Sequence, residues 1–145
     1  MDRRDLIKLS AGAALTAKAA GAHRFFTGDE FAVVEELTEA IIPADEKSGG
    51  AKAARVADYI DKRLAEAFDA SERDQWRSGL KPFVAAAAPD RAAMLDRLAA
   101  ANDLFFLTLK KATIKAYYTS RIGIHDDLDY QGNVYQSGDY AGKLP

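Results

Sequence analysis

Apolar residues recur every three or four positions along most of this chain, which is the spacing of one face of an α-helix. In the first such stretch, Thr27 and Glu30 form a capping-box pattern, and Phe26 and Phe31 occupy the two positions of a hydrophobic staple. The stretch is predicted to end at Pro43, because proline lacks the backbone N–H that a continuing helix needs. Its apolar face is formed by Phe31, Val34, Leu37 and Ile41.

Two more helices are predicted in the middle of the chain. One covers residues 53–68, where apolar side chains recur every four residues. The other follows Ser71, which is predicted to be its N-cap with Asp74 at the third position, and Pro82 is expected to kink or end it. The apolar faces of the two helices are formed by Val56, Ile60, Leu64 and Phe68, and by Trp76, Leu80 and Phe83.

The last helical part of the chain begins at Pro89, which suits the first turn of a helix. Asn102 and Asp103 then either cap a separate final helix that ends at Tyr118 or lie inside an uninterrupted one. The apolar stripe of the first part is short and consists of Met94, Leu95 and Leu98.

The composition and the apolar periodicity of the chain change after Ser120. Residues 121–145 contain five glycines or prolines and no helical stripe. No stretch sustains the alternation of a β-strand, and the sequence has no internal repeat. The predicted fold class is therefore all-α, with a small bundle of four or five helices over residues 23–120 and an extended, irregular C-terminal tail over residues 121–145.

Length and composition favour one domain and exclude several classes of function. The chain has 145 residues, and 48% of them are hydrophobic, which is enough for a single core. Its formal net charge of −2 argues against nucleic acid as a partner, because a phosphate-binding face needs concentrated Lys and Arg. The absence of cysteine excludes disulfides, iron–sulfur clusters and covalent c-type haem. The G-x-G-x-x-G fingerprint is also absent, so the chain is predicted to hold no flavin, nicotinamide or other cofactor of its own.

The N-terminus, residues 1–22, resembles a twin-arginine signal peptide. Adjacent Arg3 and Arg4 precede a weakly hydrophobic run over residues 9–17 and an Ala-Gly-Ala sequence over residues 20–22. The alternative is an amphipathic N-terminal helix that contains two arginines by chance. The twin-arginine route exports folded proteins, so a chain without a cofactor would use it on behalf of a partner. No stretch approaches the ~20 apolar residues of a membrane span, so a membrane association would come through partners or an uncleaved signal.

His125, Asp126 and Asp127 form the one cluster that suggests a metal site or a general base. Three adjacent residues cannot all reach one ion without a special loop, so a solvated turn or a polar contact to a partner is the simpler interpretation. An enzyme that uses His125 is accordingly the least favoured function. Asp45 is predicted either to order the loop after the first helix or to contact a partner.

Six stretches of the chain match a known family in their order. They are Phe25-Phe26-Thr27, Ile41-Ile42-Pro43-Ala44-Asp45, Val56-Ala57-Asp58-Tyr59-Ile60-Asp61, Tyr117-Tyr118-Thr119-Ser120, Ile122-Gly123-Ile124 and Tyr130-x-Gly132-Asn133-Val134. This set resembles the gluconate 2-dehydrogenase subunit 3 family, the small accessory subunits of flavin-dependent sugar dehydrogenases. The resemblance implies a large FAD-containing partner of the glucose–methanol–choline type, and often a separate cytochrome c subunit. It also implies that the small subunit carries the export signal of the complex.

The C-terminal tail is predicted to bind the large partner. Tyrosine is amphipathic and enriched at interfaces, and glycine lets a backbone approach a surface closely. An irregular end without an apolar stripe gains little by folding back onto its own domain, so the alternative is a frayed tail. The predicted partner-binding residues are Tyr117, Tyr118, Tyr130, Gly132, Asn133, Tyr135 and Tyr140.

Two hypotheses of function follow. The first is a non-catalytic small subunit of a periplasmic sugar dehydrogenase complex of the gluconate or glucoside type. It would stabilise the FAD-containing catalytic subunit and carry it through twin-arginine export. The second is a free-standing exported helical protein that binds a ligand between its helices.

Overall fold

The computed structural model of the chain describes residues 23–132, and these residues contain helices and no β-strand. Five helices are longer than ten residues, in agreement with the predicted all-α bundle: α2 (Gly28–Ile41), α4 (Val56–Glu66), α5 (Ala70–Ala85), α6 (Ala88–Ala100) and α7 (Leu104–Tyr118). A short α3 (Gly50–Ala53) and the π-helical segment η1 (Ile122–Asp127) complete the fold. The predicted signal peptide, with Arg3 and Arg4, lies outside the described residues, as do Asn133, Tyr135 and Tyr140.

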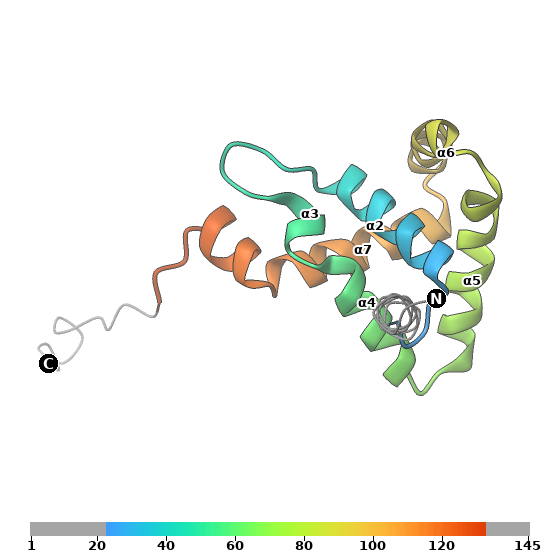
Figure 1. Cartoon of the computed structure of the whole chain (residues 1–145), viewed down its shortest axis with the longest axis horizontal. Coiled ribbons are helices and arrows are strands. Elements are labelled where there is room, and N and C mark those ends of the chain that lie inside the picture. Colours follow the sequence, from blue (N-terminus) through green and yellow to red (C-terminus); the bar gives the residue numbers. More distant parts are fainter. Residues whose placement is uncertain (1–22, 133–145) are drawn as a thin grey trace, which may run out of the picture.

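Helices α2 and α7 form the centre of the domain (Figure 1). Each packs against α4, α5 and α6 as well as against the other. Figure 1 shows that α5 and α6 lie at one end of the domain, whereas η1 continues from α7 at the opposite end. The C-terminal residues of the described chain therefore lie far from α5 and α6.

Helix α2 begins and ends where local chemistry predicts. The Thr27 hydroxyl accepts a hydrogen bond from the Glu30 amide at 3.2 Å, and the Glu30 carboxylate accepts one from the Thr27 amide at 2.9 Å. This reciprocal capping box satisfies two N–H groups that have no partner inside the helix. The helix ends at Ile41, just before Pro43, as expected.

The helix predicted over residues 53–68 is wrong in its bounds. Arg55 has a left-handed backbone with φ of 56°, and this residue separates α3 from α4. The loop before α3 and α3 itself are fastened to α2 by Glu39, whose carboxylate accepts from the Ala44 amide at 3.1 Å and from the Lys52 amide at 2.7 Å. Phe68 lies beyond the end of α4 and is fully exposed, so it does not extend the apolar face.

Helix α5 differs from its prediction at both ends. Its N-cap is Asp69 rather than Ser71, because the Asp69 carboxylate accepts the Ser71 amide at 2.8 Å. Pro82 does not end the helix, and α5 continues to Ala85. Proline removes only one hydrogen bond there, within the last turn, where the loss costs least.

Helices α6 and α7 are separate, which decides between the two predicted arrangements. Asn102 has a left-handed backbone with φ of 49°, and Asp103 caps α7 by accepting the Phe105 amide at 2.8 Å. Asn102 therefore lies at the end of α6 and Asp103 at the start of α7, as their side chains favour.

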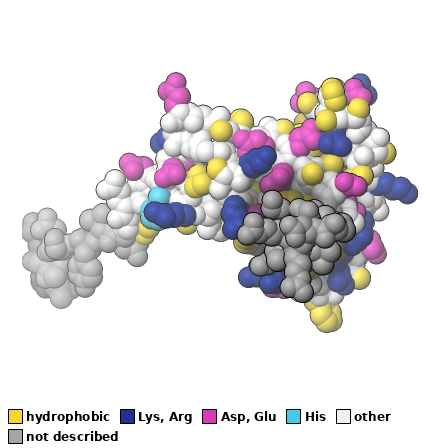
Figure 2. Space-filling model, viewed as in Figure 1, with side chains coloured by type: hydrophobic (Ala, Val, Ile, Leu, Met, Phe, Trp, Pro, Cys, Tyr) yellow, Lys and Arg dark blue, Asp and Glu magenta, His cyan; other side chains and the backbone are white. Residues whose placement is uncertain are grey.

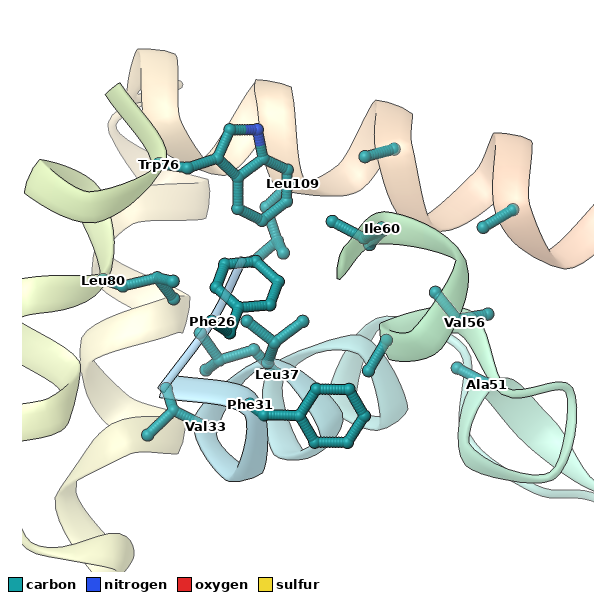
Figure 3. Packing of buried hydrophobic residues seen from close by; sticks show 14 of the residues in the cluster. Phe26, Phe31, Val33, Leu37, Ala51, Val56, Ile60, Trp76, Leu80 and Leu109 are labelled. Carbon is teal, nitrogen blue, oxygen red and sulfur yellow. The ribbon is translucent and has the colours of Figure 1, made fainter. Parts of the chain in front are cut away.

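The core is built from the apolar faces of all five long helices (Figure 3). Trp76 is 1% exposed, and its ring meets the ring of Phe105 edge to face with 5.8 Å between centroids. Gly79 permits this approach of α5 to α7, since a Cβ atom there would lie 2.0 Å from the Phe105 ring. Figure 3 shows Phe26, Leu37, Ile60 and Leu109 converging on the same interior beside Trp76.

A buried carboxylate fastens the segment before α2 to α4. Asp61 is 4% exposed and accepts three backbone N–H groups, from Arg24 at 2.7 Å, Phe25 at 2.9 Å and Phe26 at 2.8 Å. Arg77 of α5 adds a hydrogen bond to the Phe25 carbonyl at 3.1 Å and stacks over the Phe25 ring. The domain is thus anchored at the point where the predicted signal peptide ends.

Candidate partner-binding surface

Tyr117, one of the predicted partner-binding residues, lies inside the core. It is 1% exposed, and its hydroxyl makes a short hydrogen bond with the hydroxyl of Ser48. This contact ties the loop before α3 to the C-terminal end of α7. The Tyr117 side chain therefore stabilises the domain and is not presented on its surface.

Tyr118 lies beside Tyr117 but faces outward, with 38% of its surface exposed. The two rings meet edge to face, with 5.0 Å between their centroids. A hydrogen bond to the Asp127 carboxylate, assisted by partial burial, raises the pKa of the Tyr118 phenol above its ordinary value of 10.0. The phenol is therefore a hydrogen-bond donor at neutral pH, and it links α7 to η1.

Residues 122–127 were expected to be irregular, and that prediction is wrong, because they form the π-helical segment η1. Gly123 packs so closely on α7 that a Cβ atom there would lie 2.0 Å from the Tyr117 carbonyl oxygen. The Lys47 ammonium group donates to the Asp127 carbonyl at 2.6 Å, and the Tyr130 amide donates to the Ile124 carbonyl at 3.0 Å. The close approach of Gly123 to α7, the long-range Lys47 bond and the packing of Ile122 against the core together fold this segment onto the domain.

In the predicted His125-Asp126-Asp127 cluster, His125 and Asp127 make contacts within the domain. Nδ1 of His125 lies 3.1 Å from the Tyr130 carbonyl oxygen, and the Asp127 carboxylate faces the Tyr118 phenol. Within residues 23–132, no three His, Cys, Asp or Glu side chains gather so that they could hold a metal ion. Asp45 likewise orders its own loop, since its carboxylate accepts the amides of Lys47 and Ser48, each at 2.8 Å.

Three large apolar side chains are exposed at this end of the domain: Tyr118 (38%), Leu128 (60%) and Tyr130 (46%). We call them the C-terminal apolar group. Gly132 follows with φ of +96° and with open space around it, so the backbone turns there without a neighbouring element. Two of the predicted tyrosines, Tyr118 and Tyr130, are thus brought to one end of the domain with part of each side chain exposed.

The outer face of α7 is a candidate surface that the sequence reasoning missed. Leu104 (72% exposed), Leu107 (44%) and Ile114 (40%) point away from the core together with Tyr118. The signal was present in the sequence, because residues 104–118 hold more apolar side chains than one face of a helix can bury.

Charged side chains of both signs occupy the face of the domain that Figure 2 shows. On the face shown in Figure 2, basic and acidic side chains are intermixed over the helices. A nucleic-acid site would instead need a continuous basic face. None of the helices within residues 23–132 could span a membrane.

Comparison with known protein families gives a match over most of the chain. The model of the family described as gluconate 2-dehydrogenase subunit 3 matches residues 28–135, which include all the long helices, η1 and the C-terminal apolar group. No curated protein and no solved structure matches the chain significantly. The matched region covers well over half of the sequence and coincides with the folded domain, so the chain belongs to the gluconate 2-dehydrogenase subunit 3 family.

Proposed function

We propose that the chain is the non-catalytic small subunit of a periplasmic flavin-dependent sugar dehydrogenase complex. It binds and stabilises a large FAD-containing subunit of the glucose–methanol–choline type, and a cytochrome c subunit completes the assembly. Membership of the gluconate 2-dehydrogenase subunit 3 family supports a role as a subunit of a dehydrogenase complex. The flavin and the chemistry belong to the large subunit in this proposal.

The C-terminal apolar group is the observation that carries the proposal. Leu128 and Tyr130 are exposed, yet the backbone that presents them is held by η1 and by the Lys47 contact. A surface that is already ordered has a smaller conformational entropy to lose when it binds. Aromatic side chains at such a position are the usual anchors of protein interfaces.

Binding is tested by capture of the large subunit with the tagged full-length chain. Replacing Leu128 and Tyr130 together by serine should weaken capture at least tenfold, because two exposed anchors are removed. Phe68→Ser is the matched control, since Phe68 is fully exposed on another part of the domain. Flavin absorbance should accompany the large subunit in every preparation. Failure of the wild-type chain to capture the large subunit would refute the proposal.

Export is tested separately. Replacing both Arg3 and Arg4 by lysine should leave this chain and the large subunit in the cytoplasm, because the twin-arginine route requires the arginine pair. Lys8→Arg is the control, since it keeps the charge of the same segment. Asp61 supports this part of the proposal, because it fastens residues 24–26 to the folded domain directly after the signal. An unchanged periplasmic yield of both chains would remove the export role and leave the binding role standing.

A second candidate function rests on a groove between α5 and α7. It has a volume of about 660 Å³ and is lined by Leu98, Leu104 and Phe105 together with polar side chains of α5 such as Asp74 and Gln75. This volume suits a small organic ligand. A free-standing ligand-binding protein would be secreted, monomeric and stable without the large subunit, and that outcome would favour this alternative.

A further inference from the structure

The exposed apolar residues of α7 are arranged at heptad spacing. Positions 104, 107, 111, 114 and 118 are separated alternately by three and four residues, which is the spacing of the a and d positions of a coiled coil. Four of these positions carry Leu104, Leu107, Ile114 and Tyr118, and the fifth is Lys111. We call these five residues the α7 stripe.

The α7 stripe is held in a fixed orientation, because the opposite face of the helix is locked in the core. Leu109 and Thr113 are 0% exposed and Ala116 is 3% exposed. Helix α7 also packs against α2, α4, α5, α6 and η1. It cannot rotate to bury the stripe without breaking these contacts. The stripe spans about 21 Å, or four helical turns, and this is a length that one partner helix can cover.

Three lysines give the stripe its charge. Lys111 lies within it, and Lys110 and Lys115 occupy the flanking g and e positions of the same heptads. Helix α7 itself has no Asp or Glu. The four ion pairs found in the described part of the chain all use arginine as the cation, so these three lysines are not neutralised there.

The position of Lys111 distinguishes between possible occupants. A second copy of this chain would oppose lysines with lysines, which is unfavourable. A lipid surface suits a helix whose cations flank an apolar face, whereas Lys111 lies in the middle of the stripe, between Leu107 and Ile114. An amphipathic helix with carboxylates beside its apolar residues complements both the apolar side chains and the lysines of the stripe.

We propose that the α7 stripe docks an acidic amphipathic helix of the large subunit, with apolar residues at heptad spacing against Leu107 and Ile114 and with carboxylates that pair with Lys110, Lys111 and Lys115. This inference rests on the proposed function and adds the chemistry of the partner surface. It also predicts a second contact area on the domain, continuous with the C-terminal apolar group through Tyr118.

Direct contact is tested in the assembled complex with a zero-length carbodiimide, which joins amines only to carboxylates that touch them. Cross-links from Lys110, Lys111 or Lys115 should map to Asp or Glu residues on one helix of the large subunit. A wild-type complex that forms but gives cross-links only from other lysines would overturn the inference and leave the proposed function intact. Absence of the complex itself would instead refute the proposed function.

Charge reversal gives an independent measurement. Changing Lys110, Lys111 and Lys115 together to glutamate should weaken capture of the large subunit at least tenfold, most strongly at low salt, while the triple change to arginine should retain capture. The matched control is glutamate at Lys62, Lys81 and Arg97, three exposed cations on other helices. All these positions are exposed, so circular dichroism should show unchanged folding.

Two other results would count against an acidic helix. Binding of the wild-type chain to vesicles that contain phosphatidylglycerol, with loss of binding in the glutamate triple variant, would assign the stripe to a membrane surface. A concentration-dependent dimer in sedimentation, abolished by Ile114→Lys, would assign it to a second copy. Equal capture by the two glutamate triple variants would also refute the inference.

Discussion

Replacing Asp61 by alanine should destabilise the domain far more than any exposed carboxylate change on the same helix. Asp61 is the sole acceptor that the structure gives to the amides of Arg24, Phe25 and Phe26. Alanine leaves these three donors without their partner and opens the start of α2. Asp61→Asn should be less severe, because the amide oxygen can still accept two N–H groups while its NH₂ group opposes the third.

The magnitude follows from how buried each donor is. A hydrogen bond to a charged group contributes about 1.5–3 kcal/mol to stability, but a donor that water can reach recovers much of that loss. The Phe26 bond is buried, whereas those of Arg24 and Phe25 are partly buried. We therefore expect Asp61→Ala to lower the free energy of unfolding by about 3 kcal/mol and Asp61→Asn by about half as much. A loss of 3 kcal/mol is a large part of the ~5–15 kcal/mol that stabilises a typical domain.

Urea denaturation followed by circular dichroism measures these differences. Asp58→Asn is the control, because Asp58 also lies on α4 but makes only an exposed pair with Arg55, which contributes about 0–1 kcal/mol. Hydrogen exchange should show loss of protection at the Phe26 amide in Asp61→Ala alone. If Asp61→Ala and Asp58→Asn unfold at the same urea concentration, the reasoning about the buried carboxylate is refuted.

Two further predictions concern the helix ends. Arg91 donates to two backbone carbonyls at the end of α5 and pairs with Glu36 at 2.7 Å. Arg91→Ala should therefore lower the free energy of unfolding by about 2 kcal/mol, and Arg91→Lys should lose less, because lysine restores only part of these contacts. Equal stability of Arg91→Ala and wild type in urea would contradict this prediction. The raised pKa of Tyr118 means that its bond to Asp127 adds stability that is complete below pH 10.0 and is lost as the pH rises through the folded-state pKa. The stability difference between wild type and Tyr118→Phe should therefore be constant near neutral pH and shrink above pH 10.0; a difference that grows with alkaline pH would refute it.

Several helix bounds were predictable because the interactions that set them are local. The capping box of Thr27 and Glu30, the stop before Pro43 and the cap at Asp103 each involve residues a few positions apart. The break at Arg55 was not predictable in this way. Arg55 lies just after α3, and Glu39 of another helix fixes this part of the chain by accepting hydrogen bonds from the amides of Ala44, in the preceding loop, and Lys52, in α3.

The site could be predicted only in part. A pattern of tyrosines identifies candidate anchors, but neighbouring residues on a helix differ in direction by about 100°. Tyr117 therefore points into the core and Tyr118 points out of it, although they are adjacent and chemically identical. Similarly, η1 has no apolar stripe, and it folds because Lys47, Tyr118 and the Gly123 contact hold it from outside.

The sequence by itself determined the all-α fold, some of the helix boundaries and the family, because helical periodicity, caps and motif order are properties of consecutive residues. Only the tertiary structure decided which apolar side chains the domain covers. Helix α7 has apolar residues on both faces, and its exposed face became evident once α2, α4, α5 and α6 were seen to pack against the other. The same holds for Asp61, whose role depends on three amides more than thirty residues away in sequence. Burial is a property of the whole packed chain, and no local pattern specifies which face of a helix remains for a partner.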